Sequence, residues 1–462
     1  TDDVVEVGPH AAVRRYRGQT EQILQTQGDT HESMVLHLGD GHEGVRFAEG
    51  GRKLVLGEHG TAAGNLVAFE RRVTCLHIGD TEFLEDGGHV EIDNFGFQGI
   101  PVDDRWLSDE HLSTALDIAK QFSILMDRNG FDTLWLSEHH FQREGYGCIP
   151  NIPMLSIYLS QFTQNLNFGG FFNVITAWHP LRLAEDFAMA DILTDGRVRL
   201  GVGRGYIARE VETLGGFLED NDANRELFEE QIEVLRKAWD NPSFSHHGKR
   251  YQIPADVLHR GSKLEDITVV PKPLHGEVEM WQPITSATQR GYDFMVKHGI
   301  NGVIATIGEP AEKFAQEYQS ALMRVGTETQ LGERLAIGCQ IHIAETKEKA
   351  LKEAQPFYEE LLKGLAPLGR FPNLSDDQIK STFAPQLAPS ACLPTIHDAV
   401  NEGSWICGPP EHVIEKLQEL QNRFPGLERV FIAAGGLGIP PSAMLADIDS
   451  FANDVMPVFT KI

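Results

Sequence analysis

The residues of this chain best placed to do chemistry are Glu138, His139 and His140, which follow the apolar run 133–136 after a single serine, Ser137. That run is short and bulky, as is typical of a parallel strand buried on both faces. In parallel α/β proteins the reacting groups gather where the strands end. Because side chains alternate along a strand, Glu138 and His140 should point one way and His139 the other. The pattern favours one histidine aimed into a pocket over a metal site built from all three, and we expect no metal.

The segments that must position these residues alternate between strand and helix patterns from about residue 88 to the C-terminus. Eight strands are expected, at 90–99, 132–138, 166–175, 197–204, 278–286, 301–306, 337–344 and 428–434. Helices are expected between them, at 108–129, 153–164, 180–193, 225–239, 288–298, 309–325, 347–362 and 411–423. Eight alternating units predict an α/β fold, a (β/α)8 TIM barrel, more readily than an open sheet.

Two stretches are too long and too rich in proline to be ordinary connections of such a barrel. They span about 240–277 and 364–405, and we expect them to be insertions. A long proline-rich loop after a strand and helix unit is a candidate active-site lid, which we place at 364–405.

Residues 1–87 differ from the rest, with frequent glycines and short apolar runs separated by turns. This pattern predicts a small β-rich N-terminal extension with a helix near 20–27. We therefore expect two domains, an extension of unknown role over 1–87 and a barrel over 88–462.

Composition narrows the class of protein. The 462 residues are 41% hydrophobic, enough for a large core, and the net charge of −27 disfavours nucleic acid and anionic membranes as partners. No apolar run approaches the roughly 18 residues of a membrane helix. Five scattered cysteines without a CxxC pair, and an acidic start without an apolar signal segment, favour a cytoplasmic location.

A glycine-rich turn follows the strand expected at 197–204, with the sequence Gly-Val-Gly-Arg-Gly-Tyr and Arg204 at its centre. It matches neither the Rossmann fingerprint nor the P-loop. Arginine at the rim of a barrel strand suits phosphate, because its planar fork donates two parallel hydrogen bonds. The alternative is a tight turn with a surface arginine. Glu210, a few residues on, either favours a helix N-terminus or faces the pocket mouth and binds a ligand ring.

A second candidate phosphate site is the run Thr285, Ser286, Ala287 and Thr288, which opens a helix. Small hydroxyl residues at this position commonly cap the helix. The free N–H groups and the positive end of the helix dipole also bind phosphate. Arg204 on the neighbouring strand makes phosphate binding a competitive interpretation.

In several ordered blocks the sequence resembles the bacterial luciferase-like family of flavin-dependent monooxygenases. The first of these blocks is similar to the luciferase α subunit in particular. The matching blocks are 130–141, 166–169, 179–186, 195–206 and 407–414.

The resemblance implies a TIM barrel that binds reduced FMN at the C-terminal ends of its strands. By position, His139 matches the histidine needed for flavin and oxygen chemistry, as a base or a stabiliser. The cofactor-binding positions implied in the same way are Arg204, Ser286, Ala287, Thr288, Glu210, Phe171, Phe172 and Asn173. Phe171 and Phe172 match a strand position beside the flavin ring where relatives can have a cis peptide bond.

The activity implied is that of a two-component monooxygenase, which transfers one oxygen of O2 to a small organic substrate through a C4a-(hydro)peroxyflavin. Its partners would be a separate flavin reductase that supplies FMNH2 and a second copy of the chain in a homodimer. Two alternatives stay open. One is an oxidoreductase of the same superfamily that uses the deazaflavin F420, and the other is a flavin-binding protein without catalysis.

Overall fold

The computed structural model describes residues 3–6, 11–15, 21–26, 34–37, 73–78, 106–145, 147–286, 288–371, 373–384, 387, 390–433 and 439–459. The chain divides into two compact units, Thr1–Leu66 and Val67–Ile462. Within the described residues, no helix is both long enough and apolar enough to cross a membrane.

The first unit contains one antiparallel sheet in the order β1-β2-β3-β4. Its strands are β1 Asp3–Glu6, β2 Ala11–Arg15, β3 Glu21–Thr26 and β4 Met34–His37. The β-rich character expected of this segment is therefore present, but the helix predicted near 20–27 is wrong. Strand β3 pairs with both β2 and β4 in the antiparallel sheet, and this pairing overrides the helix propensity of its Glu, Gln and Leu.

The second unit is a closed ring of eight parallel strands, which confirms the predicted (β/α)8 barrel. The ring runs β5-β6-β7-β9-β14-β15-β16-β18 and returns to β5. Its strands are β5 Val73–Ile78, β6 Thr133–Leu136, β7 Asn167–Gly170, β9 Val198–Gly203, β14 Met280–Pro283, β15 Asn301–Ile304, β16 Leu335–Ile343 and β18 Arg429–Ala433.

The first strand of the ring differs from the expected one. The segment predicted as that strand, 90–99, lies outside the described residues, and β5 takes the position between β18 and β6. β5 falls within the segment assigned from the sequence to the N-terminal extension. Its short apolar pattern suits an antiparallel meander and a buried parallel strand equally well, so the sequence could not distinguish them.

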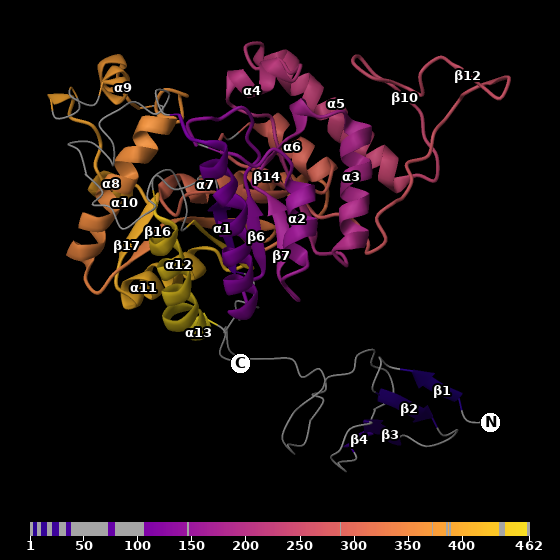
Figure 1. The fold of residues 1–462 in the computed structure, drawn as a ribbon, viewed down its shortest axis with the longest axis horizontal. Coiled ribbons are helices and arrows are strands. Elements are labelled where there is room, and N and C mark those ends of the chain that lie inside the picture. Colours follow the sequence, from indigo (N-terminus) through magenta and orange to yellow (C-terminus); the bar gives the residue numbers. More distant parts are fainter. Residues whose placement is uncertain are drawn as a thin grey trace. The chain divides into compact units, whose positions relative to one another are not determined.

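A helix follows each strand of the ring, as the alternation predicts. These helices are α1 Asp109–Arg128, α2 Ile152–Ser160, α3 Pro180–Leu193, α5 Asn221–Asp240, α6 Gln289–Lys297, α7 Glu309–Arg324, α8 Lys347–Leu365, α11 Pro410–Arg423 and α12 Pro441–Ser450, with α8 and α11 both following β16. Ser108 caps α1, since its hydroxyl accepts a hydrogen bond from the backbone N–H of His111 at 3.1 Å. In Figure 1 strands β6, β7 and β14 lie at the centre of this unit with helices around them.

Short elements occupy the loops between strands and helices. Strand β8 Asn173–Val174 and the 3-10 helix Ile175–Ala177 precede α3, and α4 Ala208–Thr213 precedes α5. The insertion expected at 240–277 holds two hairpins, β10 His246–His247 with β11 Gln252–Ile253 and β12 Leu258–His259 with β13 Ser262–Lys263, which project from the barrel (Figure 1). The insertion expected at 364–405 holds α9 Asp376–Phe383, α10 Ile396–Asn401 and the start of β17 Trp405–Gly408, which pairs with β16. The chain ends with the π-helical turn Phe451–Val455 and α13 Met456–Phe459.

Aromatic side chains fill the barrel interior. Trp135 of β6 and Trp281 of β14 meet edge to face, with ring centroids 6.0 Å apart, within a buried cluster that includes Phe431. Gly169 makes room for Trp135, because a Cβ at that position would lie 2.4 Å from the indole ring. The interior is therefore a packed core, and open space is left to the ends of the strands.

Helix α8 is fixed to the barrel through a buried histidine of β16. Nδ1 of His342 lies 3.0 Å from Asp447 of α12, and Nε2 lies 3.2 Å from Glu353 of α8. Burial opposes the charged imidazole, but the hydrogen bonds to the two carboxylates dominate and raise the pKa of His342. This contact sets where α8 lies, and α8 leads into the expected lid.

Candidate functional site

The structure places His139 at the C-terminal end of β6 with its ring almost fully buried. Its backbone N–H donates to the carbonyl of Ile149 at 3.1 Å. Gly147 packs against the imidazole so closely that a Cβ there would lie 2.6 Å from both Cβ and Cδ2 of His139. The backbone around His139 therefore leaves its ring little freedom.

Glu210 orients the imidazole of His139. This carboxylate lies in the first turn of α4 and is buried. It lies 3.1 Å from Nδ1 of His139, and it accepts hydrogen bonds from the backbone N–H of His140 at 2.8 Å and from the amide of Gln142 at 2.5 Å. Burial alone would raise its pKa, but these hydrogen bonds and the charge of His139 hold the pKa of Glu210 below its ordinary value. An ionised carboxylate only accepts hydrogen bonds, so Nδ1 of His139 donates its proton to Glu210.

Glu138 is a second buried carboxylate with several donors around it. Its oxygens lie 3.0 Å from Nε2 of His140, and they accept from the amide of Asn173 at 2.9 Å and from the indole N–H of Trp178 at 2.7 Å. Glu138 and His140 thus face the same neighbourhood, as strand alternation predicts. Glu138 fixes the loop that carries His139.

A large cavity of about 460 Å³ opens at the C-terminal ends of the strands, and His139 lines it. Phe171 and Phe172 form one wall, with ring centroids 4.4 Å apart, and Phe171 also stacks on Phe431 at 4.8 Å. The peptide bond between Phe171 and Phe172 is cis. Asn173 continues this wall, and its Oδ1 is buried without a hydrogen-bond partner among the described residues. The wall is thus flat and aromatic, with one buried acceptor beside it.

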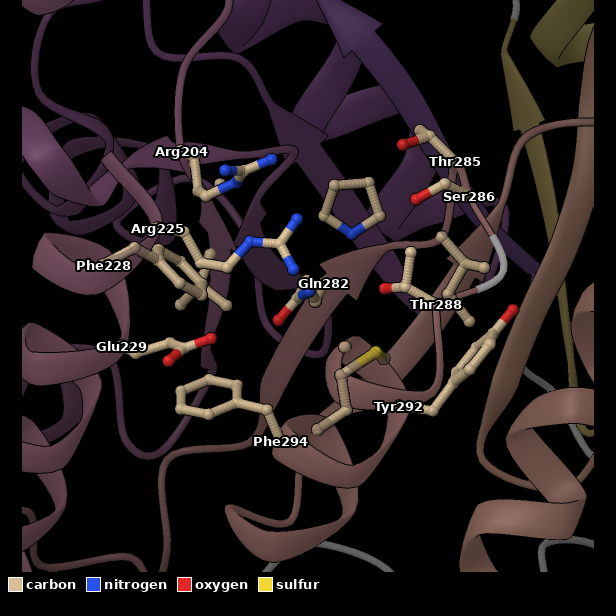
Figure 2. Close-up of a pocket in the computed structure, with 16 residues that line it drawn as sticks. Arg204, Arg225, Phe228, Glu229, Gln282, Thr285, Ser286, Thr288, Tyr292 and Phe294 are labelled. Carbon is tan, nitrogen blue, oxygen red and sulfur yellow. The ribbon is translucent and has the colours of Figure 1, made fainter. Parts of the chain in front are cut away.

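A smaller pocket of about 130 Å³ adjoins the large cavity, and Gly203, Arg204, Pro283 and Thr285 line both. The two spaces therefore meet at Arg204. Figure 2 shows the guanidinium groups of Arg204 and Arg225 on one side of the small pocket and the hydroxyls of Ser286 and Thr288 on the other.

Polar groups with spare hydrogen-bonding capacity surround the small pocket. Thr288 occupies the N-cap position of α6, but its side chain makes no capping hydrogen bond. The hydroxyl of Tyr292 and Oε1 of Gln282 are buried without partners among the described residues. Burial, followed by the repulsion of Arg225, lowers the pKa of Arg204 against the attraction of Glu229. Two adjacent arginines with facing hydroxyls suit a doubly charged anion such as a phosphate.

The structure brings together most of the residues singled out in the sequence. His139, Glu210, Phe171, Phe172, Asn173 and Arg204 line the large cavity, while Arg204, Ser286 and Thr288 line the small pocket. Ala287 lies outside the described residues. Within those residues, no three His, Cys, Asp or Glu side chains are grouped as a metal site.

Sequence reasoning missed Arg225 and Arg370. Arg225 lies in the second turn of α5, where its pattern is that of an exposed helical face, and its place in the small pocket follows only from how α5 packs against α3 and the 3-10 helix Ile175–Ala177. Arg370 falls in the expected lid and lines the large cavity. Neither position carries a local motif that could have identified it.

The combination of an eight-stranded barrel, a buried histidine and carboxylate pair, a flat aromatic wall and a cationic pocket is that expected of a flavin-binding barrel. The sequence profile of the luciferase-like monooxygenase family matches residues 102–425. The match covers more than half of the chain, so the protein belongs to the luciferase-like monooxygenase family.

Relatives and solved structures agree with this family. The chain is 27% identical over 202 residues to the oxygenase component of a flavin-dependent trigonelline monooxygenase from Acinetobacter baylyi, which is 43% of this chain and 51% of that protein. The first curated relatives are matched over only 36% to 51% of their own length.

Two solved structures share the fold at low sequence identity. One is the oxygenating constituent of 3,6-diketocamphane monooxygenase from Pseudomonas putida in complex with FMN, with a TM-score of 0.59 at 17% identity, covering 79% of this chain and 98% of that chain. The other is an F420-dependent secondary alcohol dehydrogenase, with a TM-score of 0.54 at 15% identity, covering 76% and 96%. At such identities the likeness shows the fold alone.

Proposed function

We propose that this protein is the oxygenase component of a two-component system, which uses reduced FMN and O2 to insert one oxygen atom into a small organic substrate. The observation that supports the proposal best is that the large cavity and the small pocket adjoin and differ in character. A large aromatic cavity containing His139 meets a cationic pocket at Arg204. A flat ring system with a phosphate tail fits such a pair of compartments.

The residues present match the parts of FMN. Arg204 and Arg225 would bind the phosphate together with the hydroxyls of Ser286 and Thr288, and Phe171 with Phe172 would support the ring. The buried acceptors and hydroxyls without partners, on Asn173, Gln282 and Tyr292, would gain hydrogen bonds from the polar atoms of the cofactor. When bound, reduced FMN supplies the two electrons with which O2 is activated.

His139 holds and moves the proton in this proposal. Because Glu210 keeps the proton on Nδ1, Nε2 can accept a proton from a group in the cavity and return it. The buried carboxylate also stabilises the imidazolium formed in between. A base held in one tautomer is effective because no reorientation is needed during the reaction.

Exclusion of water is the task proposed for α8 and the segment after it. Tyr358, Leu361 and Leu365 of α8 line the cavity together with Phe371 from the expected lid. A dry cavity protects a reactive oxygen species from being lost as H2O2. The reducing equivalents would come from a separate flavin reductase, and we propose a homodimer in solution.

The test is the reaction of FMNH2 and O2 in the presence of the protein, followed by stopped-flow absorbance and H2O2 release. We expect the wild type to slow H2O2 release relative to free FMNH2, and His139→Asn to restore fast release while still binding FMN. His259→Asn, a histidine exposed on the β12 hairpin, is the matched control and should behave as wild type. Unchanged H2O2 release in His139→Asn would show that the proposed role is wrong.

An F420-dependent hydride transfer is the second candidate, because the F420-dependent alcohol dehydrogenase shares this fold. Titration with FMN and with F420 distinguishes the two cofactors directly. Tight FMN binding with no effect on the reaction of FMNH2 with O2 would instead indicate a flavin-binding protein without catalysis.

A further inference from the structure

The large cavity has one charged group that neither the fold nor the proposed flavin chemistry uses. Five charged or readily protonated side chains line this cavity, namely Glu138, His139, Arg204, Glu210 and Arg370. The two carboxylates are engaged by internal donors and His139 by Glu210. Arg204 lies at the small pocket and donates to Asn221 at 2.9 Å. Arg370 is left as the cation that faces the cavity without an acceptor among the described residues.

Local structure fixes where Arg370 lies. It follows Gly369, which has a φ of +70°. The N–H of Gly369 donates to the carbonyl of Ala366 at 3.0 Å, and the N–H of Arg370 donates to that of Leu365 at 3.1 Å. This pair of bonds is the Schellman motif that ends α8. Glycine is required because other residues are strained at this φ, so the backbone delivers Arg370 to one place at the cavity rim.

Arg370 also has a defined neighbour on the way to the reactive histidine. Its guanidinium carbon lies 4.9 Å from the ring centroid of Tyr206. The ring of His139 also lies against that ring, at 6.0 Å between centroids and nearly perpendicular. Tyr206 packs with Ile207, Leu365 and Leu368 in a small apolar cluster. The guanidinium and the imidazole therefore both lie against Tyr206, beside a small apolar cluster.

We infer that the organic substrate carries a carboxylate, which Arg370 binds, and that oxygen is inserted at an apolar part of the molecule away from that carboxylate. The inference rests on the proposed function and specifies its substrate class. A guanidinium binds a carboxylate through two parallel charge-assisted hydrogen bonds. The contact with Tyr206 is a cation–π contact, and no hydrogen bond to a described residue occupies the guanidinium N–H groups of Arg370.

The net charge of −27 makes a local cation necessary for such a substrate. An acidic protein repels anions at long range, but screening limits this repulsion to about 8 Å in physiological salt. Inside the cavity the electrostatic potential is determined mainly by the nearest charged side chains. The carboxylates there accept hydrogen bonds from the protein's own donors, so Arg370 is the cation nearest to a substrate that binds at the rim.

The experiment compares acids with their uncharged amides. A panel of phenyl-, indolyl- and alkyl-carboxylates, each paired with its primary amide, is titrated by calorimetry into the full-length protein with and without FMN. For the best-binding pair we expect wild type to favour the acid by about tenfold or more, as suits a bidentate pair. Arg370→Gln should abolish the preference and Arg370→Lys should keep part of it. Arg260→Gln, in the exposed turn between β12 and β13, makes the same charge change elsewhere and should behave as wild type.

A purely structural role for Arg370 is tested in the same series. Added guanidinium should restore the preference for acids in Arg370→Ala, which a lost packing contact would not allow. The FMN affinity and the thermal unfolding midpoint of Arg370→Gln should match wild type. The inference is overturned if no acid is preferred by wild type, if the preference survives in Arg370→Gln, or if that variant loses FMN affinity instead. Failure of the wild type to bind FMN would refute the proposed function separately, since the acid preference is also measured without FMN.

Discussion

Replacement of Glu210 by glutamine tests how the buried carboxylate supports His139. The carboxylate faces three donors, on His139, His140 and Gln142. An amide of the same shape can accept with its oxygen, but its NH2 group then points at one of the donors. One buried donor is left unsatisfied, which costs about 1–3 kcal/mol of folding free energy. His139 is retained but no longer held in one tautomer, so we expect oxygenation to slow by about 10²-fold, the low end for a general acid–base group.

The pH dependence of the free energy of unfolding tests the same role of Glu210. The pKa of Glu210 is lowered in the folded protein, so the carboxylate stabilises the fold above the ordinary carboxyl pKa of about 4.3, and this stability is lost as the pH falls through the lower folded value. In urea unfolding, the gap between wild type and Glu210→Gln should be full at pH 7 and should narrow below about pH 4. A gap that stays constant over this range, or a variant with wild-type stability, would refute the reasoning.

Three further substitutions test other parts of the structure. Gly147→Ala should displace the ring of His139, because the new Cβ would lie 2.6 Å from it, and we expect about 10²-fold slower turnover with unchanged FMN affinity. Lys363→Met leaves Glu360 without its buried partner at 2.9 Å, where both side chains have 0% exposure, and should cost about 3–5 kcal/mol in urea unfolding. The double variant, with Glu360→Met added to Lys363→Met, should recover most of the lost free energy of unfolding. His342→Gln should lower the unfolding temperature most below about pH 6.5 and progressively less above it, because the raised pKa of His342 makes its stabilisation disappear as the pH rises.

The sequence predicted the barrel well where a feature is local. The strand before Glu138 and the Ser108 cap depend on a few neighbouring residues, and both are found as predicted. The predictions that were wrong concern segments whose structure depends on contacts with distant parts of the chain. β3 was predicted as a helix because its propensities favour one, and β5 was assigned to the wrong sheet because its pattern fits either. Arg225 was missed because its position depends on the packing of α5 against α3 and the 3-10 helix Ile175–Ala177, which has no signature in the sequence around it.

The distribution of charge around the two compartments explains how a chain this acidic can serve anionic ligands. Both cavity carboxylates, Glu138 and Glu210, are turned toward donors of the protein itself, so they contribute fixed structure and little free negative field. The arginines are arranged the other way, with Arg204 and Arg225 at the small pocket and Arg370 at the rim of the large one. Since short-range charges outweigh the screened net charge within a cavity, each arginine provides a local cation although the net charge of the chain is −27. An anion at each end would also fix a flat cofactor and a small substrate in one relative orientation beside His139, which a uniformly apolar cavity could not do.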